Sequence, residues 1–313
     1  MRVVGLGRAG CNIAAAFSKF PQYETYGIDT TDDADITIRP KTSHEEYDAK
    51  FPNLKRKLKF SDEEVLVVVA GSGSISGGVL RLLEQLKSNK LRVLYIQGDT
   101  SIMSEIQKKQ EKIVCNVLQE YARSGIIENI TLINNTMLEK SIGDMSIIGY
   151  YDTLNQAIVN TVHMMNVFRH AEPVIGNFIS PAEISRICTI GIVDIESEEE
   201  EEEKWFYRLT APRDVVYYYG INEDDLKNDG TLLRKINNFV KSRLEENLNV
   251  SYGVFKTTYD QKYCYCIKHS SVVQLYTELD DQEISWSYFN PRKENKMGIN
   301  LDKMREKLSS LRG

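Results

Sequence analysis

No apolar run in the sequence approaches the roughly 18 residues that a membrane-spanning helix needs, so we expect no association with a membrane. The opening residues lack the charged stretch, the apolar stretch and the cleavage site of a secretion signal, which favours a cytoplasmic location. Basic residues are not in excess: 39 Lys and Arg stand against 45 Asp and Glu, and the net charge is −6. Proteins that bind nucleic acid through charge usually carry a basic excess, so we expect no direct nucleic-acid contact.

Cysteine and histidine are scarce. The five cysteines are scattered and odd in number, which suits a reducing cytosol better than a disulfide scaffold. The four histidines form no cluster with metal-ligand spacing. We therefore expect no metal site that is made by protein side chains alone.

The chain does contain enough apolar material for a core. Of its 313 residues, 42% are hydrophobic and 27% are charged, which excludes wholesale disorder and allows one large domain or two ordinary ones. In the first 150 residues, β-branched apolar runs alternate with segments of helical periodicity. The predicted strands cover residues 2–5, 24–28, 64–70, 91–97 and 130–133, with 36–39 as a weaker candidate. The predicted helices cover residues 11–19, 79–87 and 101–124. This alternation predicts an α/β fold with a doubly wound, mostly parallel sheet.

A long predicted helix separates this part from a smaller α+β unit. Residues 151–168 keep a helical period throughout, and Pro173 and Gly176 follow them. The predicted elements of the second unit are helices at residues 181–187 and 232–246, and strands at residues 215–219, 250–257 and 262–268.

Two segments allow more than one interpretation. Residues 196–203 hold seven glutamates in eight positions, which favours a solvated loop, and the alternative is an acidic surface that faces a partner. Residues 301–311 place Leu301, Met304, Leu308 and Leu311 on one helical face. That face is suited to docking on its own domain or on a neighbouring subunit.

A glycine-rich loop follows the first predicted strand. Residues 5–10 read Gly-Leu-Gly-Arg-Ala-Gly, and Asp29 ends the next strand, which is the spacing of a dinucleotide fingerprint. Glycines let the backbone approach a phosphate, and the helix N-terminus supplies N–H groups and partial positive charge. One interpretation is therefore a Rossmann-type NAD(P)-dependent enzyme that uses Gly5, Gly7, Gly10 and Asp29.

A second glycine-rich loop, residues 71–78, lies between a buried strand and a helix. Its Ser72, Ser74 and Ser76 add hydroxyl donors. Two such loops at the carboxyl ends of neighbouring parallel strands would hold a polyphosphate from both sides, which a dinucleotide enzyme does not need. Neither loop carries the lysine of a P-loop, so helix dipoles and a metal ion must balance the phosphate charge.

Together the two loops resemble those of the tubulin/FtsZ superfamily. Residues 7–12, Gly-Arg-Ala-Gly-Cys-Asn, are similar to the first nucleotide loop of that family, and residues 70–74, Ala-Gly-Ser-Gly-Ser, resemble its G-G-T-G-[ST] signature. Ser72 keeps the hydroxyl of the family's Thr, whereas Ile75 stands where the family has a final glycine. The nucleotide-binding residues predicted in this part of the chain are Gly7, Arg8, Ala9, Gly10, Asn12, Asp29, Gly71, Ser72, Gly73 and Ser74.

Three more segments extend the resemblance, which covers residues 1–273. Asn135 follows a predicted strand where the family carries a polar residue near the ribose and base. Tyr151 and Asn155 match the family's aromatic and amide readers of guanine, and they lie one helical turn apart. Residues 178–183 are the best match to the family's catalytic segment, Asn-x-Asp-x-x-[Asp/Glu]. Glu183 takes the place of the carboxylate that polarises water, and Ser180 replaces the first Asp.

The resemblance implies a GTPase that binds GTP with Mg²⁺ and polymerises head-to-tail into cytoskeletal filaments, because the next subunit's Glu183 completes each active site. It implies other copies of the chain and a cargo or adaptor protein as partners. The implied domains are a nucleotide-binding domain (1–150), a central helix (151–170), a second, activation domain (171–275) and a tail with an amphipathic helix (276–313). The compact, divergent chain looks most like phage- or plasmid-encoded relatives.

Two alternatives to this interpretation stay open. The first is the NAD(P)-dependent enzyme, which explains the first glycine loop but neither the second loop nor the pair Tyr151 and Asn155. The second is a nucleotide-dependent scaffold that does not hydrolyse its ligand, which Ser180 and Ile75 favour. The family's γ-phosphate loop has no clear counterpart here, and Thr42-Ser43 is the nearest polar pair.

Overall fold

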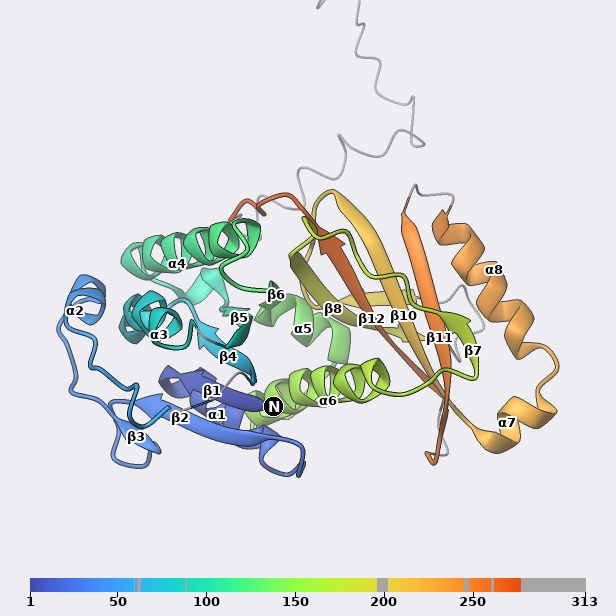
Figure 1. Cartoon of the computed structure of the whole chain (residues 1–313), viewed down its shortest axis with the longest axis horizontal. Helices are drawn as coiled ribbons and strands as arrows, with labels where there is room; N and C mark the ends of the chain where they lie inside the picture. The colour runs from blue at the N-terminus through green and yellow to red at the C-terminus, as the bar shows by residue number, and fades with distance from the viewer. Residues whose placement is uncertain are drawn as a thin grey trace, which may run out of the picture. The chain divides into compact units, whose positions relative to one another are not determined.

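The computed structural model describes residues 1–58, 60, 63–87, 89–195, 202–244, 248–259 and 262–276, with only the backbone of Glu202. Residues 1–276 form one compact unit. In this part of the chain, strands β1 to β12 build one sheet in the order β3-β2-β1-β4-β5-β6-β8-β12-β10-β11-β7, and β9 pairs with β8 (Figure 1). Residues 196–201 of the acidic run and the predicted helix at 301–311 lie outside the described residues.

The first half of the sheet is parallel and confirms the predicted α/β class. Its strands are β1 (Arg2–Leu6), β2 (Glu24–Asp29), β3 (Ile36–Thr37), β4 (Glu64–Ala70), β5 (Lys90–Gln97) and β6 (Asn129–Asn134). Its α-helices are α1 (Gly7–Phe17), α2 (His44–Ala49), α3 (Val79–Gln85), α4 (Glu105–Arg123) and α5 (Asn135–Ile142). Two 3₁₀ helices, η1 (Ser74–Gly78) and η2 (Thr100–Ile102), follow β4 and β5.

Helices cover both faces of this half, as the continuous apolar run of β4 predicts. Val65, Val67 and Val69 face a core that includes residues of α3 and α4. Leu66 and Val68 face the opposite core, which includes residues of α1 and α6. All five side chains are buried, so β4 is the central strand of this half.

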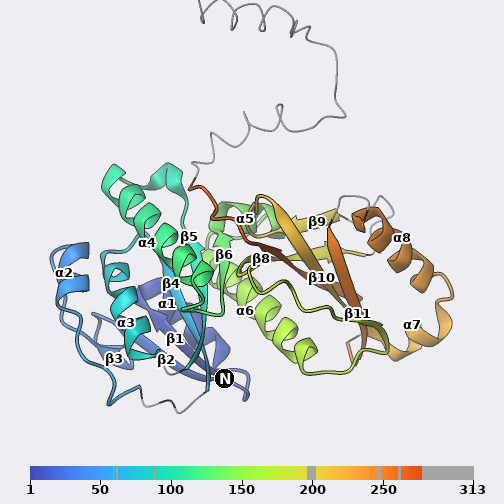
Figure 2. The same cartoon turned by 45° about the horizontal axis from the view of Figure 1, so that its top comes forward.

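The second half of the sheet is mixed and continues from the first without a break. Its elements are α6 (Tyr150–Arg169), β7 (Ile175–Asn177), β8 (Ile187–Asp194), β9 (Glu202–Trp205), β10 (Pro212–Asn222), α7 (Glu223–Asn228), α8 (Leu232–Leu244), β11 (Asn249–Thr257) and β12 (Tyr263–Ser270). β8 pairs in parallel with the start of β6 and antiparallel with β12, and it thereby joins the two halves. Figure 2 shows α8 on one face of this half and α6 on the other. None of the helices in the described residues combines the length and apolarity needed to cross a bilayer.

The predicted helix at residues 181–187 is wrong. Residues 182–185 form a turn, in which the Ser185 N–H donates to the Ala182 carbonyl at 2.7 Å, and β8 begins at Ile187. A helix here would need a buried apolar face, but Ile184 is 58% exposed. Ile187 instead pairs with Ile130 of β6 and with Ser270 of β12.

The expectation of a solvated acidic loop is wrong for Glu203, whose side chain is only 8% exposed. Its carboxylate pairs with Lys268 at 3.2 Å and with Arg243 at 3.3 Å, and it accepts the Trp205 indole N–H at 2.9 Å. Burial alone would raise the pKa of Glu203, but Lys268 and the other donors outweigh it and lower the pKa. Glu203 is therefore a buried anchor between β9 and β12.

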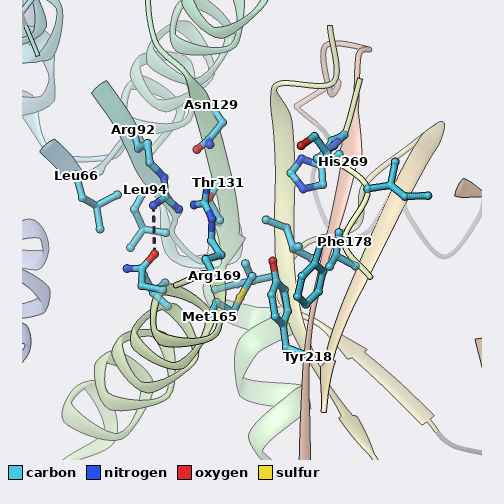
Figure 3. Close-up of a pocket in the computed structure, with 18 residues that line it drawn as sticks. Leu66, Arg92, Leu94, Asn129, Thr131, Met165, Arg169, Phe178, Tyr218 and His269 are labelled. Atoms are coloured by element: carbon cyan, nitrogen blue, oxygen red, sulfur yellow. Dashed lines mark hydrogen bonds between the residues drawn. The ribbon is translucent and has the colours of Figure 1, made fainter. Parts of the chain in front are cut away.

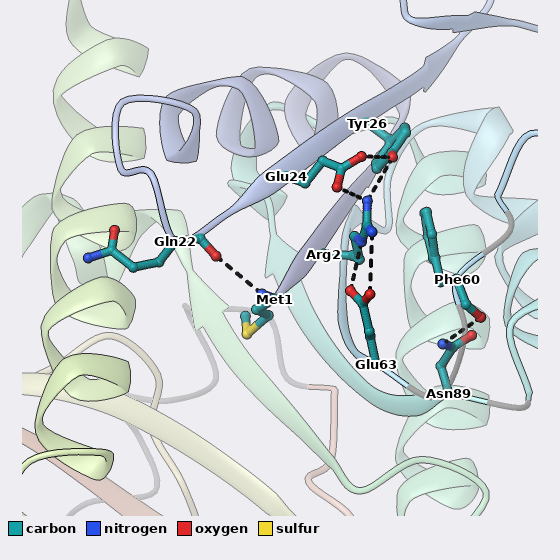
Figure 4. A network of polar contacts seen from close by, with 8 residues as sticks. All are labelled: Met1, Arg2, Gln22, Glu24, Tyr26, Phe60, Glu63 and Asn89. Atoms are coloured by element: carbon teal, nitrogen blue, oxygen red, sulfur yellow. Dashed lines mark hydrogen bonds and ion pairs between the residues drawn. The ribbon is translucent and has the colours of Figure 1, made fainter.

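A cluster around Arg2 joins the amino ends of β1, β2 and β4 (Figure 4). The guanidinium donates to Glu63 at 2.8 Å and to the Tyr26 hydroxyl at 3.1 Å, and it also pairs with Glu24. Its Cζ lies 5.2 Å from the centre of the Phe60 ring. These contacts hold the strands together at the edge opposite to the glycine-rich loops.

Candidate functional site

The two glycine-rich loops lie at the carboxyl edge of the parallel sheet, where the strand order reverses. β1 continues to β2 on one side, whereas β4, its neighbour on the other side, continues to β5 and β6. In the register, Leu6 lies opposite Val69 and Ala70 lies opposite Ile96, so these strands end at the same edge. Open α/β sheets bind their ligands at such a reversal.

The first loop packs so closely that its glycines leave no room for side chains. Gly7 has a φ of +74°, which is a backbone conformation that favours glycine. A Cβ on Gly10 would lie 2.5 Å from the Val68 carbonyl oxygen, and a Cβ on Gly5 would overlap Gly10. The backbone of the loop is therefore fixed against β4.

The second loop packs against side chains of β5 and α4. A Cβ on Gly71 would overlap the Tyr95 hydroxyl and would lie 2.8 Å from Cγ of Glu111. The Ser76 hydroxyl donates to the Gly71 carbonyl at 2.9 Å and to the Gly73 carbonyl at 2.6 Å. Ser76 is thus a structural residue, whereas Ser72 is half-buried and Ser74 is exposed.

Ile75 brings the two loops together. Its Cγ2 would lie 2.7 Å from a Cβ on Gly7 and 3.9 Å from a Cβ on Gly73. The isoleucine at the position where the tubulin/FtsZ pattern has glycine therefore occupies space between the loops. A ligand held by both loops must contact or displace this side chain.

The helices that begin in the two loops have no side-chain cap. The N-cap residues of α1 and η1, Leu6 and Gly73, make no side-chain cap bond, and neither first turn contains an acidic residue. α3 and α6 also begin without a side-chain cap, whereas α2, η2, α4, α5 and α7 are capped by the side chains of Ser43, Asp99, Ser104, Asn134 and Asn222. Uncapped N–H groups and the helix dipole at the glycine-rich loops are suited to an anion.

The remaining predicted residues of the first loop lie around the start of α1. Arg8 and Asn12 are exposed, and Ala9 is half-buried. Asp29 ends β2 beside β1, and its Oδ1 accepts the Thr30 N–H at 2.7 Å. Burial and the nearby Asp29 carboxylate raise the pKa of the Cys11 thiol to about 12, so Cys11 stays protonated.

The start of α6 presents an aromatic ring and an amide on the same side of the helix. Tyr151 is 63% exposed, and its ring packs edge-on against Tyr150 with centroids 5.1 Å apart. The Tyr150 hydroxyl donates to Glu139 of α5 at 2.8 Å, so Tyr150 is anchored while Tyr151 points outward. Asn155, one turn further along, is half-buried.

Asn135 follows β6, which ends beside β5 at the same edge. It is half-buried, whereas the preceding Asn134 caps α5 by accepting the Met137 N–H at 3.0 Å. The end of β2 and the loops after β1, β4 and β6 therefore lie along one edge, with the loop after β5 between those after β4 and β6. The sheet brings together Gly7, Asp29, Gly71 and Asn135 from separate parts of the chain.

Glu183 does not belong to this group. It is exposed and lies four residues before Ile187, which pairs with Ile130 at the amino end of β6. The glycine-rich loops lie at the other end of the strands, and six residues of strand rise about 20 Å. Within one chain, Glu183 is therefore at the edge of the sheet opposite to the loops.

A cavity of about 280 Å³ also lies away from the loops, toward the last turns of α6 (Figure 3). Leu94, Met165 and Tyr218 contribute apolar walls, and Arg92 and Arg169 contribute guanidinium groups. Ser180 and Pro181 of the predicted catalytic segment line it, but no residue of either glycine-rich loop does. The cavity is therefore separate from the predicted nucleotide site.

His269 lines this cavity and makes the folding stability depend on pH. Its Nδ1 donates to the Ser185 carbonyl at 3.3 Å, and burial lowers the pKa of His269 to about 4. A lowered histidine pKa means that the fold favours the neutral form. The contribution of His269 to the free energy of unfolding is therefore complete above about pH 6.5 and is lost between pH 6.5 and pH 4. Other groups, Glu111 among them, titrate in the same window, so the contribution of His269 is the difference between two proteins. We expect wild-type protein to lose about 3 kcal/mol more than His269→Asn over this window, as measured by urea unfolding. The exposed His170→Asn is the control, and equal losses in wild type and His269→Asn would contradict the prediction.

Sequence reasoning missed the loop after β5. Gly98 follows this strand directly, Asp99 caps η2, and Thr100 is buried. A Cβ on Gly98 would lie 3.8 Å from the Ser72 hydroxyl oxygen, so this loop borders the second glycine-rich loop. The signal was available, because Gly98-Asp99-Thr100 ends a buried strand as the other loops do.

In the described residues, no group of three or more His, Cys, Asp or Glu side chains could hold a metal ion. Mg²⁺ commonly uses phosphate oxygens and water with one or two protein oxygens. The Ser72 and Ser74 hydroxyls beside the uncapped helix starts fit that kind of site.

No family model matches the chain, and no curated protein sequence matches it. Solved structures do. TubZ from Bacillus thuringiensis serovar israelensis, in GDP-form protofilaments, matches with a TM-score of 0.66 and 14% identity over 96% of this chain and 93% of that chain. An FtsZ dimer from M. jannaschii matches with a TM-score of 0.61 and 13% identity over 86% of this chain and 87% of that chain. GDP-bound CetZ1 from Haloferax volcanii matches with a TM-score of 0.60 and 14% identity over 92% of this chain and 99% of that chain. The chain therefore has the tubulin/FtsZ fold, which confirms the predicted resemblance at the level of the fold.

Proposed function

We propose that this chain, with its tubulin/FtsZ fold, binds GTP and assembles head-to-tail into filaments in which GTP is hydrolysed between subunits. The observation that carries the proposal is the pair of glycine-rich loops on adjacent strands β1 and β4, each opening into a helix without a side-chain cap. Solved relatives of this fold include protofilament and filament structures of TubZ. We also propose a cytoplasmic filament, since GTP is available there and all five cysteines are free.

Each part of the site has a distinct role in this proposal. The backbone N–H groups of residues 7–10 and 71–74 bind the phosphates, and the Ser72 and Ser74 hydroxyls add donors. Mg²⁺ would balance the phosphate charge. Tyr151 stacks on the guanine and Asn155 bonds its edge, while Asn135 lies toward the ribose. Asp29 ends β2, on the other side of the first loop, and contributes to the site from there.

The position of Glu183 supports a site shared between subunits. Because Glu183 and the glycine-rich loops lie at opposite edges of the sheet, a second copy stacked along the strand direction would bring its Glu183 to the first copy's loops. This contact joins two different surfaces and does not close, so it produces a filament. Glu183 would then orient the water that attacks the terminal phosphate.

Right-angle light scattering tests the proposal, with GTP, ATP or NAD added together with Mg²⁺ while phosphate release is followed. We expect scattering to rise with GTP alone and phosphate to appear with it. Scattering without phosphate would instead support a nucleotide-dependent scaffold, which the Ser180 and Ile75 departures favour. NAD binding without any response to triphosphates would support the NAD(P)-dependent enzyme and overturn the proposal.

Tyr151→Ala tests the base contact. Stacking of an aromatic side chain on a base is worth about 1–3 kcal/mol, so we expect GTP to bind about 5- to 150-fold more weakly. Because Tyr151 is 63% exposed, we expect the free energy of unfolding to change by less than about 0.5 kcal/mol. Calorimetric titration with GDP and urea unfolding measure the two effects. Tyr259→Ala, another exposed tyrosine, is the control, and unchanged GDP affinity in Tyr151→Ala would exclude the stacking role.

A further inference from the structure

A buried carboxyl group lies directly behind the second glycine-rich loop. Glu111 of α4 is 0% exposed. Its Oε1 accepts the Gly98 N–H at 2.9 Å, and its Oε2 accepts the Tyr276 hydroxyl proton at 2.9 Å. A buried carboxylate is costly unless its oxygens are hydrogen-bonded, so both contacts are needed to keep Glu111 in place.

Glu111 contacts the loops that follow two adjacent strands. Gly98 begins the loop after β5, and Gly71, in the loop after β4, packs against Cγ of Glu111. The Tyr95 hydroxyl, which also supports Gly71, donates to the Glu111 carbonyl oxygen at 3.0 Å. A displacement of Glu111 would therefore move the backbone on which the phosphates are proposed to rest.

Tyr276 ends a strap, residues 271–276, that runs from β12 back to α4 (Figure 1). The Gln274 N–H donates to the Gln119 side-chain oxygen at 2.7 Å, and the Gln119 amide donates to the Gln274 carbonyl at 3.2 Å. The Gln274 side-chain oxygen accepts the Thr210 N–H, just before β10, at 2.6 Å. The strap is thus bonded both to α4 and to the second half of the sheet.

We propose that Glu111 is a positioning residue for the nucleotide, acting through Gly98 and Gly71, and that the Tyr276 hydroxyl makes this positioning depend on the docked strap. The inference rests on the proposed GTP-binding function. It describes a coupling: nucleotide binding stabilises the docked strap, and the docked strap strengthens nucleotide binding by the same factor.

The charge environment of Glu111 explains why the loss of one donor matters. The titratable side chains that interact with it are Tyr95, Cys115, Tyr207 and Tyr276, which are all neutral near pH 7. Burial raises the pKa of Glu111 to about 7, against the opposing effect of the two hydrogen bonds. In Tyr276→Phe the ring still covers Glu111 while Oε2 loses its donor, so protonation becomes easier. A neutral carboxyl is a weaker acceptor for the Gly98 N–H, so the loop is held less firmly.

The test uses Tyr276→Phe, which removes one hydroxyl group and leaves the ring. In calorimetric titration, Tyr276→Phe is expected to bind GTPγS at least fivefold more weakly than wild type does. In wild-type protein, bound GTPγS is expected to slow hydrogen exchange at Gly98 and at residues 274–276. The factor of slowing is expected to be similar to the ratio of the two affinities. Glu111→Gln keeps the shape and both hydrogen-bonding positions, so its affinity is expected to lie between those of wild type and Tyr276→Phe. Tyr259→Phe, an exposed tyrosine that does not contact Glu111, is the matched control.

The outcomes separate the coupling from the function on which it rests. If wild type binds GTPγS but Tyr276→Phe binds it equally well and exchange in the strap is unchanged, the coupling is wrong and the proposed function stands. A Tyr276→Phe variant that is less stable to urea but has unchanged affinity also overturns the coupling, because its role is then only structural. If wild type binds no guanine nucleotide, both proposals fail.

Discussion

Gly71→Ala is expected to abolish GTP-dependent assembly and to weaken GTP binding by about a hundredfold or more. The new methyl group would overlap the Tyr95 hydroxyl, and Tyr95 is fully buried and bonded to the Glu111 carbonyl. Tyr95 therefore has no room to move, and the loop must shift away from β5. A misplacement of about 1 Å costs about a hundredfold in rate where catalysis depends on positioning, and we expect a loss of that order here in binding.

The same substitution is expected to destabilise the fold moderately, because overpacking in a well-packed core costs about 1–3 kcal/mol. Calorimetric titration with GDP and urea unfolding measure the two effects separately. Gly230→Ala is the matched control, since a Cβ there meets nothing within 4 Å. If Gly71→Ala bound GDP as tightly as Gly230→Ala does, the second glycine-rich loop would not be the phosphate site.

Glu183→Ala is expected to keep filament formation and to lose hydrolysis. Glu183 is exposed and lies far from its own glycine-rich loops, so neither folding nor GTP binding by the same chain depends on it. Removal of a positioned general base or water-orienting carboxylate typically costs about 10²- to 10⁴-fold in rate. Filaments of the variant are therefore expected to persist after wild-type filaments have disassembled.

Light scattering and phosphate release, recorded together with GTP and Mg²⁺, measure this prediction. Glu172→Ala is the control, because Glu172 is also an exposed acid between α6 and β8. Phosphate release at the wild-type rate from Glu183→Ala would show that another group orients the water. Loss of scattering in Glu183→Ala alone would show that Glu183 contributes to the subunit contact and not only to hydrolysis.

Most of the first half of the fold could be predicted because its signals are local. The run at residues 64–70 has no polar alternation, and that pattern is characteristic of a strand buried on both faces, as β4 is. Each glycine-rich loop directly follows a predicted strand, and in a parallel sheet the loops that follow neighbouring strands lie at the same edge. The start of α6, with Tyr151 and Asn155, was predictable from helical periodicity in the same way.

The second half was harder to predict because its pairing partners lie far apart in the sequence. β8 pairs Ile187 with Ile130 and with Ser270, and no local pattern in residues 181–187 indicates either contact. Glu203 belongs to an acidic run that looks solvated, yet Lys268 and Arg243 approach it from other elements and pair with it in the interior. Charges of this kind are buried only when tertiary contacts pair them.

The sequence by itself therefore determined the α/β class, the two loops and the residue types suited to a phosphate, since glycine content, periodicity and strand composition act over short distances. Only the tertiary structure decided which of these residues share a site. It gave Ser76 a structural role, placed Ile75 between the loops, separated Glu183 from them and put Glu111 behind them. The physical reason is that the order and register of the strands set which side chains meet. Strand order and register depend on packing between segments that are far apart in the sequence, such as β4, α4 and the strap at residues 271–276.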